Sequence, residues 1–254
     1  MKGSHILLHP TAIARSLGAL AFLLVLASVG GQLMTYLMGH DHIYGLVKLF
    51  YLDEERNIPT SFSTLLLLFA SLLLAVIMGL EKQQAESRLI YWAILSFGFL
   101  FMAADEVLSI HERWTEPVRE LLGNGNLGIF YYAWVIPYFI LILILVPLFL
   151  RFLIRLPTKT KFAFVIAGAI YIAGSMGVEL IGGYYAEMHG RFNLTYSMIV
   201  TVEESLEMGG VILFIWALLS YISDNYKEVQ FRIEDVPRKV VIEKQSRRLR
   251  LAKS

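Results

Sequence analysis

Four side chains that can bind cations or carry protons stand close together in the segment ADEVLSIHE. They are Asp105, Glu106, His111 and Glu112, and they end an apolar run that begins at residue 89. Carboxylates together with imidazole suit Zn, Fe and Mn, whereas carboxylates alone suit Ca or Mg. The same groups can also accept and donate protons. The segment therefore predicts a metal site or a site of proton transfer.

Two further apolar segments carry carboxylates. GVELIGGYY contains Glu179, and TVEESLEMGG contains Glu203, Glu204 and Glu207, with no Lys or Arg inside the apolar runs around them. A charge at the centre of a bilayer costs roughly 2.5–3.5 kcal/mol on insertion scales, so such acids are by default a hypothesis of function. Bound cations, shared protons, water or arginines at the rim must relieve their repulsion; the rim candidates are Arg113, Arg119 and Arg191.

The elements that must position these acids are apolar segments of membrane-spanning length. Hydrophobic residues make up 57% of the 254 residues and charged residues only 17%, whereas soluble domains are less apolar and more charged. Six segments are long enough to cross a core of roughly 30 Å: 14–38, 61–80, 89–110, 128–150, 162–183 and 198–222. We therefore expect an all-α polytopic membrane protein, with a six-helix domain over 1–223 and a basic tail over 224–254.

The link between His40 and Pro59 has an apolar middle that is too short to span a membrane, and we expect a helix lying in the interface there.

Lys and Arg concentrate in the links 81–88 and 151–161 and in the tail. By the positive-inside rule both termini are expected to be cytoplasmic. The third and fifth spans then run outward and the sixth runs inward, so their acids should converge at one depth on the outer side.

This convergence defines a candidate site. Asp105, Ser109 and Glu112 share a helix face, as do Glu203 and Glu207. We expect a divalent metal ion (Zn, Fe, Mn or Ca) as the cofactor, although the H-E-x-x-H and E-x-x-H motifs of known metal sites are absent. His40, His42 and His189 are expected near the mouth of the site. The candidate ligands are Asp105, Glu106, His111, Glu179, Glu203, Glu204 and Glu207.

Composition excludes several classes of chemistry. The chain has no cysteine, which rules out disulfides, thiolate metal sites and a cysteine nucleophile. A net charge of +1 gives no support for nucleic-acid binding. Glu112, Glu187, His189 and Arg191 also fit a simpler interpretation as solvated loop residues.

Three functions remain open at this point. The first is a metal-binding membrane protein, or a membrane-embedded metal-dependent enzyme in which a spare carboxylate serves as general base. The second is a proton- or cation-coupled transporter or channel, which would need a polar path to the cytoplasmic side. The third is a non-catalytic subunit or assembly factor of a larger membrane complex. In each case the basic tail could rest on anionic lipid.

The segments NIPTSFS, DEVLSIHE and EESLEM, taken in this order, resemble a family of bacterial polytopic integral membrane proteins. The resemblance covers most of residues 45–222, and it departs from the pattern at MAADE, where a more hydroxyl-rich sequence is expected. It implies a bacterial inner-membrane location and treats the acid and histidine segments as one unit. It implies no activity, because the family brings none with it.

Overall fold

The computed structural model describes residues 9–39, 45–54, 56–83, 89–123 and 125–226, and within these residues the regular structure is entirely helical. The expected histidines His40 and His42, and the tail from 227 onward, lie outside the described residues. Six helical segments are long and apolar enough to cross a membrane, which confirms the expected all-α polytopic bundle. They are α1 (Pro10–Met38), α3 (Ile58–Gln83), α4 (Leu89–Leu108), α6 (Val135–Arg155), the path from α7 to α8 (Thr158–His189) and α9 (Leu194–Asn225).

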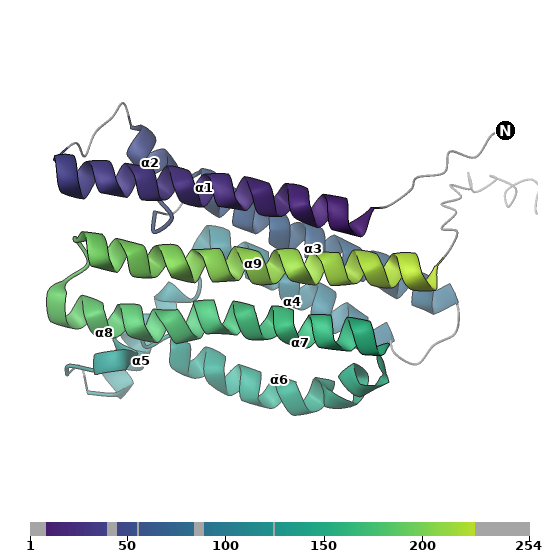
Figure 1. Cartoon of the computed structure of the whole chain (residues 1–254). Coiled ribbons are helices and arrows are strands. Elements are labelled where there is room, and N and C mark those ends of the chain that lie inside the picture. The colour runs from purple at the N-terminus through teal and green to yellow at the C-terminus, as the bar shows by residue number, and fades with distance from the viewer. Residues whose placement is uncertain (1–8, 40–44, 55, 84–88, 124, 227–254) are drawn as a thin grey trace, which may run out of the picture.

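The last helix, α9, is the centre of the bundle. It packs against α1, α3 and α7, while α3 and α4 form a second close pair (Figure 1). In the most apolar 18-residue stretch of α9, 67% of the residues are buried. In the corresponding stretch of α6, only 11% are buried. Residues on α9 are therefore in contact with most of the other spans, and acids placed on it lie inside the bundle.

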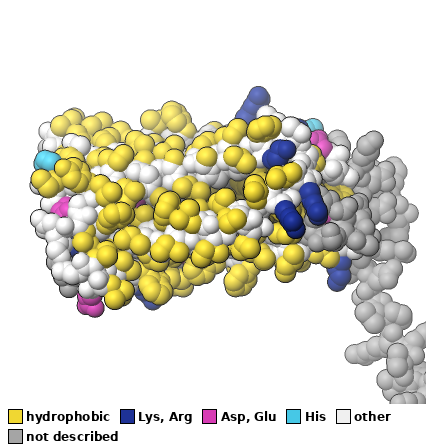
Figure 2. Space-filling model, turned by 90° about the horizontal axis from the view of Figure 1, so that it is seen from below, with side chains coloured by type: hydrophobic (Ala, Val, Ile, Leu, Met, Phe, Trp, Pro, Cys, Tyr) yellow, Lys and Arg dark blue, Asp and Glu magenta, His cyan; other side chains and the backbone are white. Residues whose placement is uncertain are grey.

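The two ends of the bundle differ. We call the end where α1 ends and α9 begins the site end, and the opposite end, where α1 begins and α9 ends, the termini end (Figure 1). Hydrophobic side chains cover the middle of the face shown in Figure 2, and most of its Lys and Arg side chains lie toward the termini end. The exposed basic residues there include Arg151, Arg155 and Lys159. This apolar belt is the surface expected for contact with a lipid bilayer.

Short elements connect the spans at the site end. They are α2 (Leu46–Phe50) in the link where an interfacial helix was expected, η1 (Glu112–Trp114), α5 (Thr115–Leu121) and η2 (Gly128–Phe130). The fourth span begins at Val135, not at residue 128, because 128–134 form a 3-10 turn and a loop. An apolar count alone missed this boundary, since Ile129, Phe130 and the following aromatic residues are as hydrophobic as a helix.

The fifth span contains a change of helical pitch. The α7 helix (Thr158–Ile172) passes into a π-helical stretch, η3 (Ala173–Val178), and then into α8 (Glu179–His189). This continuous path extends six residues beyond the expected end at 183. Short π-helical stretches insert an extra residue into a helix and are frequent at functional sites. Here the stretch ends at Val178, directly before Glu179.

Candidate functional site

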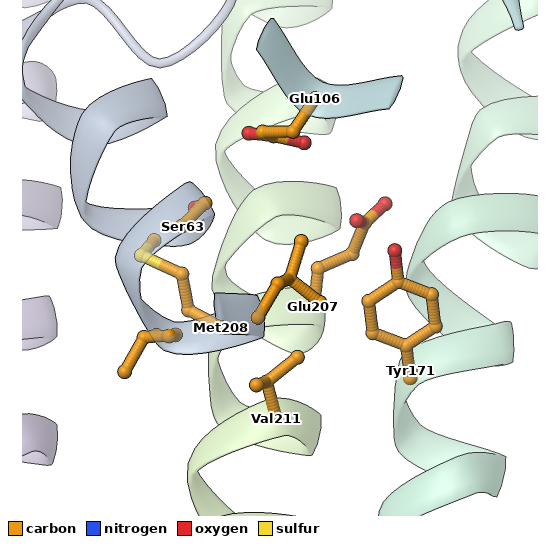
Figure 3. A pocket seen from close by; sticks show the side chains of 8 residues that line it. Ser63, Glu106, Tyr171, Glu207, Met208 and Val211 are labelled. Atoms are coloured by element: carbon orange, nitrogen blue, oxygen red, sulfur yellow. The ribbon is translucent and has the colours of Figure 1, made fainter. Parts of the chain in front are cut away.

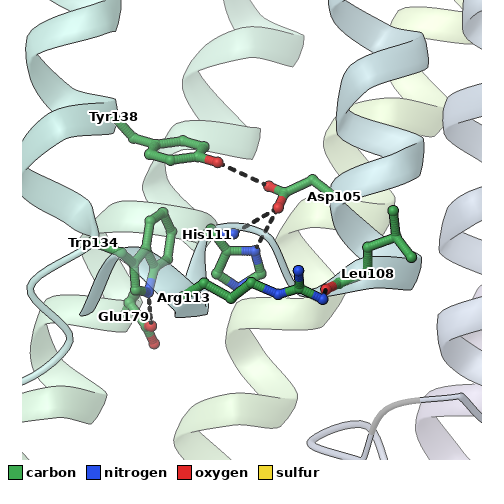
Figure 4. Close-up of polar contacts among 7 residues, drawn as sticks. All are labelled: Asp105, Leu108, His111, Arg113, Trp134, Tyr138 and Glu179. Carbon is green, nitrogen blue, oxygen red and sulfur yellow. Dashed lines mark hydrogen bonds and ion pairs between the residues drawn. The ribbon is translucent and has the colours of Figure 1, made fainter. Parts of the chain in front are cut away.

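Asp105 and His111 form a hydrogen-bonded pair at the end of α4 (Figure 4). The backbone N–H of His111 donates to Asp105 Oδ1 at 2.7 Å, and His111 Nδ1 lies 3.2 Å from the same oxygen. The Tyr138 hydroxyl donates to Asp105 Oδ2 at 3.4 Å. The chain can turn back this sharply because Ser109 adopts a left-handed conformation with φ +48°, which is uncommon for a residue other than glycine.

Trp134 connects this pair to Glu179. Its ring lies against the His111 ring with centroids 4.7 Å apart, and its Nε1–H donates to Glu179 Oε1 at 3.0 Å (Figure 4). Burial alone would lower the pKa of His111, but the hydrogen bond and the charge of Asp105 outweigh it and raise the pKa. With Nδ1 held by Asp105, Nε2 is the nitrogen that can exchange a proton with another molecule.

Five carboxyl groups meet inside the bundle, and we call them the acid cluster: Glu106 of α4, Glu179 of α8, and Glu203, Glu204 and Glu207 of α9. The carboxyls of Glu179 and Glu203 hydrogen-bond to each other. The charges acting most strongly on Glu204 are also acidic, those of Glu106 and Glu207. Two carboxyls can approach in this way only if a proton or another cation lies between them.

Tyr171 closes the acid cluster on its α7 side. Its hydroxyl hydrogen-bonds to Glu207, and Figure 3 shows the two groups facing each other, with Glu106 above them. These three side chains, together with residues of α3 and α9, line a cavity of about 10 Å³. That is about the space of one water molecule. The other lining residues are Ser63, Leu66, Leu67, Met208 and Val211.

Glycine residues bring the fifth span close enough to α9 for this meeting. A Cβ on Gly174 would lie 2.8 Å from the Glu203 carbonyl oxygen, and a Cβ on Gly210 would lie 2.9 Å from the Ala167 carbonyl oxygen. Both are backbone contacts that no side chain could relieve by rotating. The close approach and the π-helical stretch together place Glu179 opposite Glu203.

A second set of polar residues borders the acid cluster at the site end, and the sequence analysis did not single it out. Asp53, in the loop before α3, interacts with the charges of Arg191 and Glu112, and partial burial against the protein raises its pKa to about 6. The Tyr51 hydroxyl lies 3.4 Å from Asp53 Oδ2 and 2.8 Å from Ser197 Oγ. The charge of Asp53 also acts on the cluster itself. No sequence motif marks Asp53, since it looks like part of an ordinary acidic loop.

The expected site residues are therefore brought together in two groups. Asp105 and His111 form one group, and the acid cluster forms the other, with Trp134 between them. His189 lies apart, stacked on Tyr185 with ring centroids 4.6 Å apart. As the side chains lie, the described residues contain no group of three or more His, Asp or Glu arranged to hold a metal ion. The convergence of acids is thus present, and ligand geometry is not.

Six spanning helices around a cluster of carboxyl groups define an integral membrane protein with a polar site between its helices. The chain belongs to the family described as a domain of unknown function (DUF8692), whose model matches residues 14–222. The match begins within α1 and ends in the last turn of α9, so it covers nearly the whole bundle. No curated protein and no solved structure matches the chain.

Proposed function

We propose that this membrane protein binds a divalent metal ion in the acid cluster, and that the bound ion makes the cluster a hydrolytic site. The observation that carries the proposal is the contact between the carboxyls of Glu179 and Glu203 amid three further glutamates. This arrangement needs positive charge, and carboxylate oxygens are the ligands that divalent metals such as Mn²⁺ and Ca²⁺ prefer. In the structure Glu179 hydrogen-bonds to Glu203 and Glu207 to Tyr171, and an ion would draw the carboxyls toward itself.

Asp105 and His111 have a different role in this proposal. The aspartate fixes the orientation of the imidazole through Nδ1, and Nε2 can then take a proton from a water molecule. A metal ion in the acid cluster would lower the pKa of such a water, and for zinc-bound water the pKa falls to about 7. The two groups described by the structure would thus divide the work, one binding the ion and the other accepting the proton.

The packing in the half of the bundle next to the termini end favours this function over transport. Among the described residues, the interior there is filled by large side chains that are less than 2% exposed, including Trp92, Phe152, Leu74, Ile77 and Ile215. A buried carboxyl, Glu81, does occur near that end, where the Tyr221 hydroxyl donates to it at 2.5 Å. From Glu207 to Tyr221 the rise along α9 is roughly 20 Å, and an ion path would have to cross the packed region between them.

We place the site at the outer side of a bacterial inner membrane, with both termini in the cytoplasm. The support is the distribution of basic residues, since Arg151, Arg155, Lys159 and Lys161 belong to the termini end. Cytoplasmic links carry an excess of Lys and Arg. Substrate would then reach the acid cluster from the lipid or from the outer solution.

Metal content of the protein purified in detergent, without chelator and after supply of Mn, Fe, Zn and Ca, tests the proposal. We expect about one ion per chain in the wild type and none in the Glu203→Gln/Glu207→Gln double variant. The matched control is Glu116→Gln/Glu120→Gln, which removes two exposed acids of α5 and should keep the ion. A wild type that binds none of these metals would refute the proposal and leave proton exchange or partner binding. Copurification only with partner proteins would favour a subunit role.

A further inference from the structure

A groove lies between α1 and α9, on the flank of the bundle away from α7. Its volume is about 270 Å³, near the lower limit of pockets that hold small molecules. Half of its lining comes from each helix: Gly18, Ala21, Phe22 and Val25 on α1, and Ser205, Met208, Gly209 and Ile212 on α9.

Two glycines that line the groove, which have no side chain, leave this space open. A Cβ added to Gly18 or to Gly209 would meet no atom within 4 Å, so neither glycine is needed for close helix packing. The rim of the groove continues into apolar side chains that face outward, such as Phe22 (61% exposed) and Leu23 (60% exposed). In a spanning helix these are lipid-facing positions, and the groove therefore opens onto the lipid-facing surface of the bundle.

The groove and the cavity of the acid cluster share one wall. Met208 lines both spaces, and Ser205, which lines the groove, lies between Glu204 and Glu207 in the chain. Methionine is flexible and unbranched, so its side chain can shift without a backbone change. A molecule in the groove would therefore lie one side chain away from Glu207.

A buried acceptor lies along the same two helices, toward the site end. Gln32 is 2% exposed, and its Nε2 donates to Ser28 Oγ at 3.0 Å and to Thr201 Oγ1 at 3.2 Å. Its Oε1 has no hydrogen-bond partner among the described residues. A buried acceptor without a donor costs free energy, and a hydroxyl or ammonium group of a ligand would satisfy it.

From these observations we propose that the groove holds the hydrocarbon chain of a bilayer lipid, with a donor group of that lipid directed toward Gln32. The groove continues the lipid-facing surface, its walls are apolar except for Ser205, and the Gln32 oxygen without a donor lies toward the site end. The inference rests on the proposed function in one respect, because it names a lipid as the class of substrate for the acid cluster. Occupancy of the groove itself can be tested independently.

Photolabelling in nanodiscs tests the occupancy. The probe is phosphatidylethanolamine with a diazirine in its acyl chain, because its ammonium group can donate a hydrogen bond, and the labelled peptides are mapped by mass spectrometry. We expect label to concentrate on the α1 and α9 peptides of the groove and to fall several-fold in Gly18→Leu and Gly209→Leu, which fill it. Gly30→Leu is the matched control, since Gly30 also has open space at its Cβ, lies on α1 and does not line the groove. It should label as the wild type does.

Metal content measured on the same samples separates the two proposals. Label spread evenly over all exposed helices, or unchanged in both groove-filling variants, would overturn the lipid groove, and a retained metal ion would leave the proposed function standing. Label concentrated in the groove of a protein without metal would support lipid binding and refute the metal site. Equal loss of label in Gly30→Leu would show a general effect of added side chains and would also overturn the groove proposal.

Discussion

At the scale of single residues, Trp134 connects the two groups of the site. Its ring contacts His111 and its N–H binds Glu179, so one side chain fixes the distance between the proposed base and the nearest carboxyl of the acid cluster. Sequence reasoning treats such a tryptophan as part of an interfacial aromatic belt. Its role depends on a hydrogen bond to a residue 45 positions away, which no local pattern can reveal.

Replacing Trp134 with phenylalanine should destabilise the protein and weaken metal binding. The ring contact to His111 is largely kept, but Glu179 loses the donor to its Oε1, and an unsatisfied buried acceptor costs about 1–3 kcal/mol. Thermal unfolding in detergent and Mn²⁺ titration measure the two effects. Trp114→Phe, at a side chain that is 51% exposed, should change neither. Equal behaviour of the two variants would show that the hydrogen bond is unimportant.

At the scale of elements, the π-helical stretch Ala173–Val178 and its contact with α9 determine where Glu179 lies. The sequence could predict that α4, α8 and α9 bring acids to one level, because that follows from the direction of each span. It could not predict that Asp105 would be bound to His111, because this needs the left-handed turn at Ser109. Nor could it identify Asp53, because Arg191 of the loop between α8 and α9 and Glu112 of η1 come near it only in the folded bundle.

Gly174→Ala should disturb the acid cluster. The new Cβ would lie 2.8 Å from the Glu203 carbonyl oxygen, so α9 must move, and overpacking of this kind costs about 1–3 kcal/mol. The control is Gly177→Ala in the same stretch, where a Cβ meets nothing within 4 Å. It should be neutral or slightly stabilising. Thermal unfolding and metal content distinguish the variants, and a stable Gly174→Ala protein with full metal binding would contradict this account of the packing.

At the scale of the whole molecule, the bundle has a polar half and a packed apolar half. This division, with basic residues at the termini end, places the site on the outer side in our proposal. Composition and hydropathy were sufficient to predict six spans, because bilayer thickness sets their length. They misplaced the start of α6, where an apolar loop follows η2. Hydropathy reports how hydrophobic a segment is and not whether its backbone is helical.

Single cysteines test the orientation, because the chain contains none of its own. Glu116→Cys on α5 should react with a membrane-impermeant maleimide in intact spheroplasts. Lys159→Cys, at the start of α7, should react only after the membrane is opened. Both positions are exposed, so reactivity reports the side of the membrane. The reverse pattern would place the acid cluster on the cytoplasmic side.

The position of a bound ion tests the central claim most directly. Crystals of the protein soaked in Mn²⁺ and measured at the manganese absorption edge would give an anomalous peak at each bound ion. We predict one peak inside the bundle, about 2 Å from carboxylate oxygens of Glu203 and Glu207, with Glu179 turned toward it. A peak only at the surface, or none, with the Glu179–Glu203 and Tyr171–Glu207 hydrogen bonds intact, would contradict the claim and show that protons alone hold the acid cluster together.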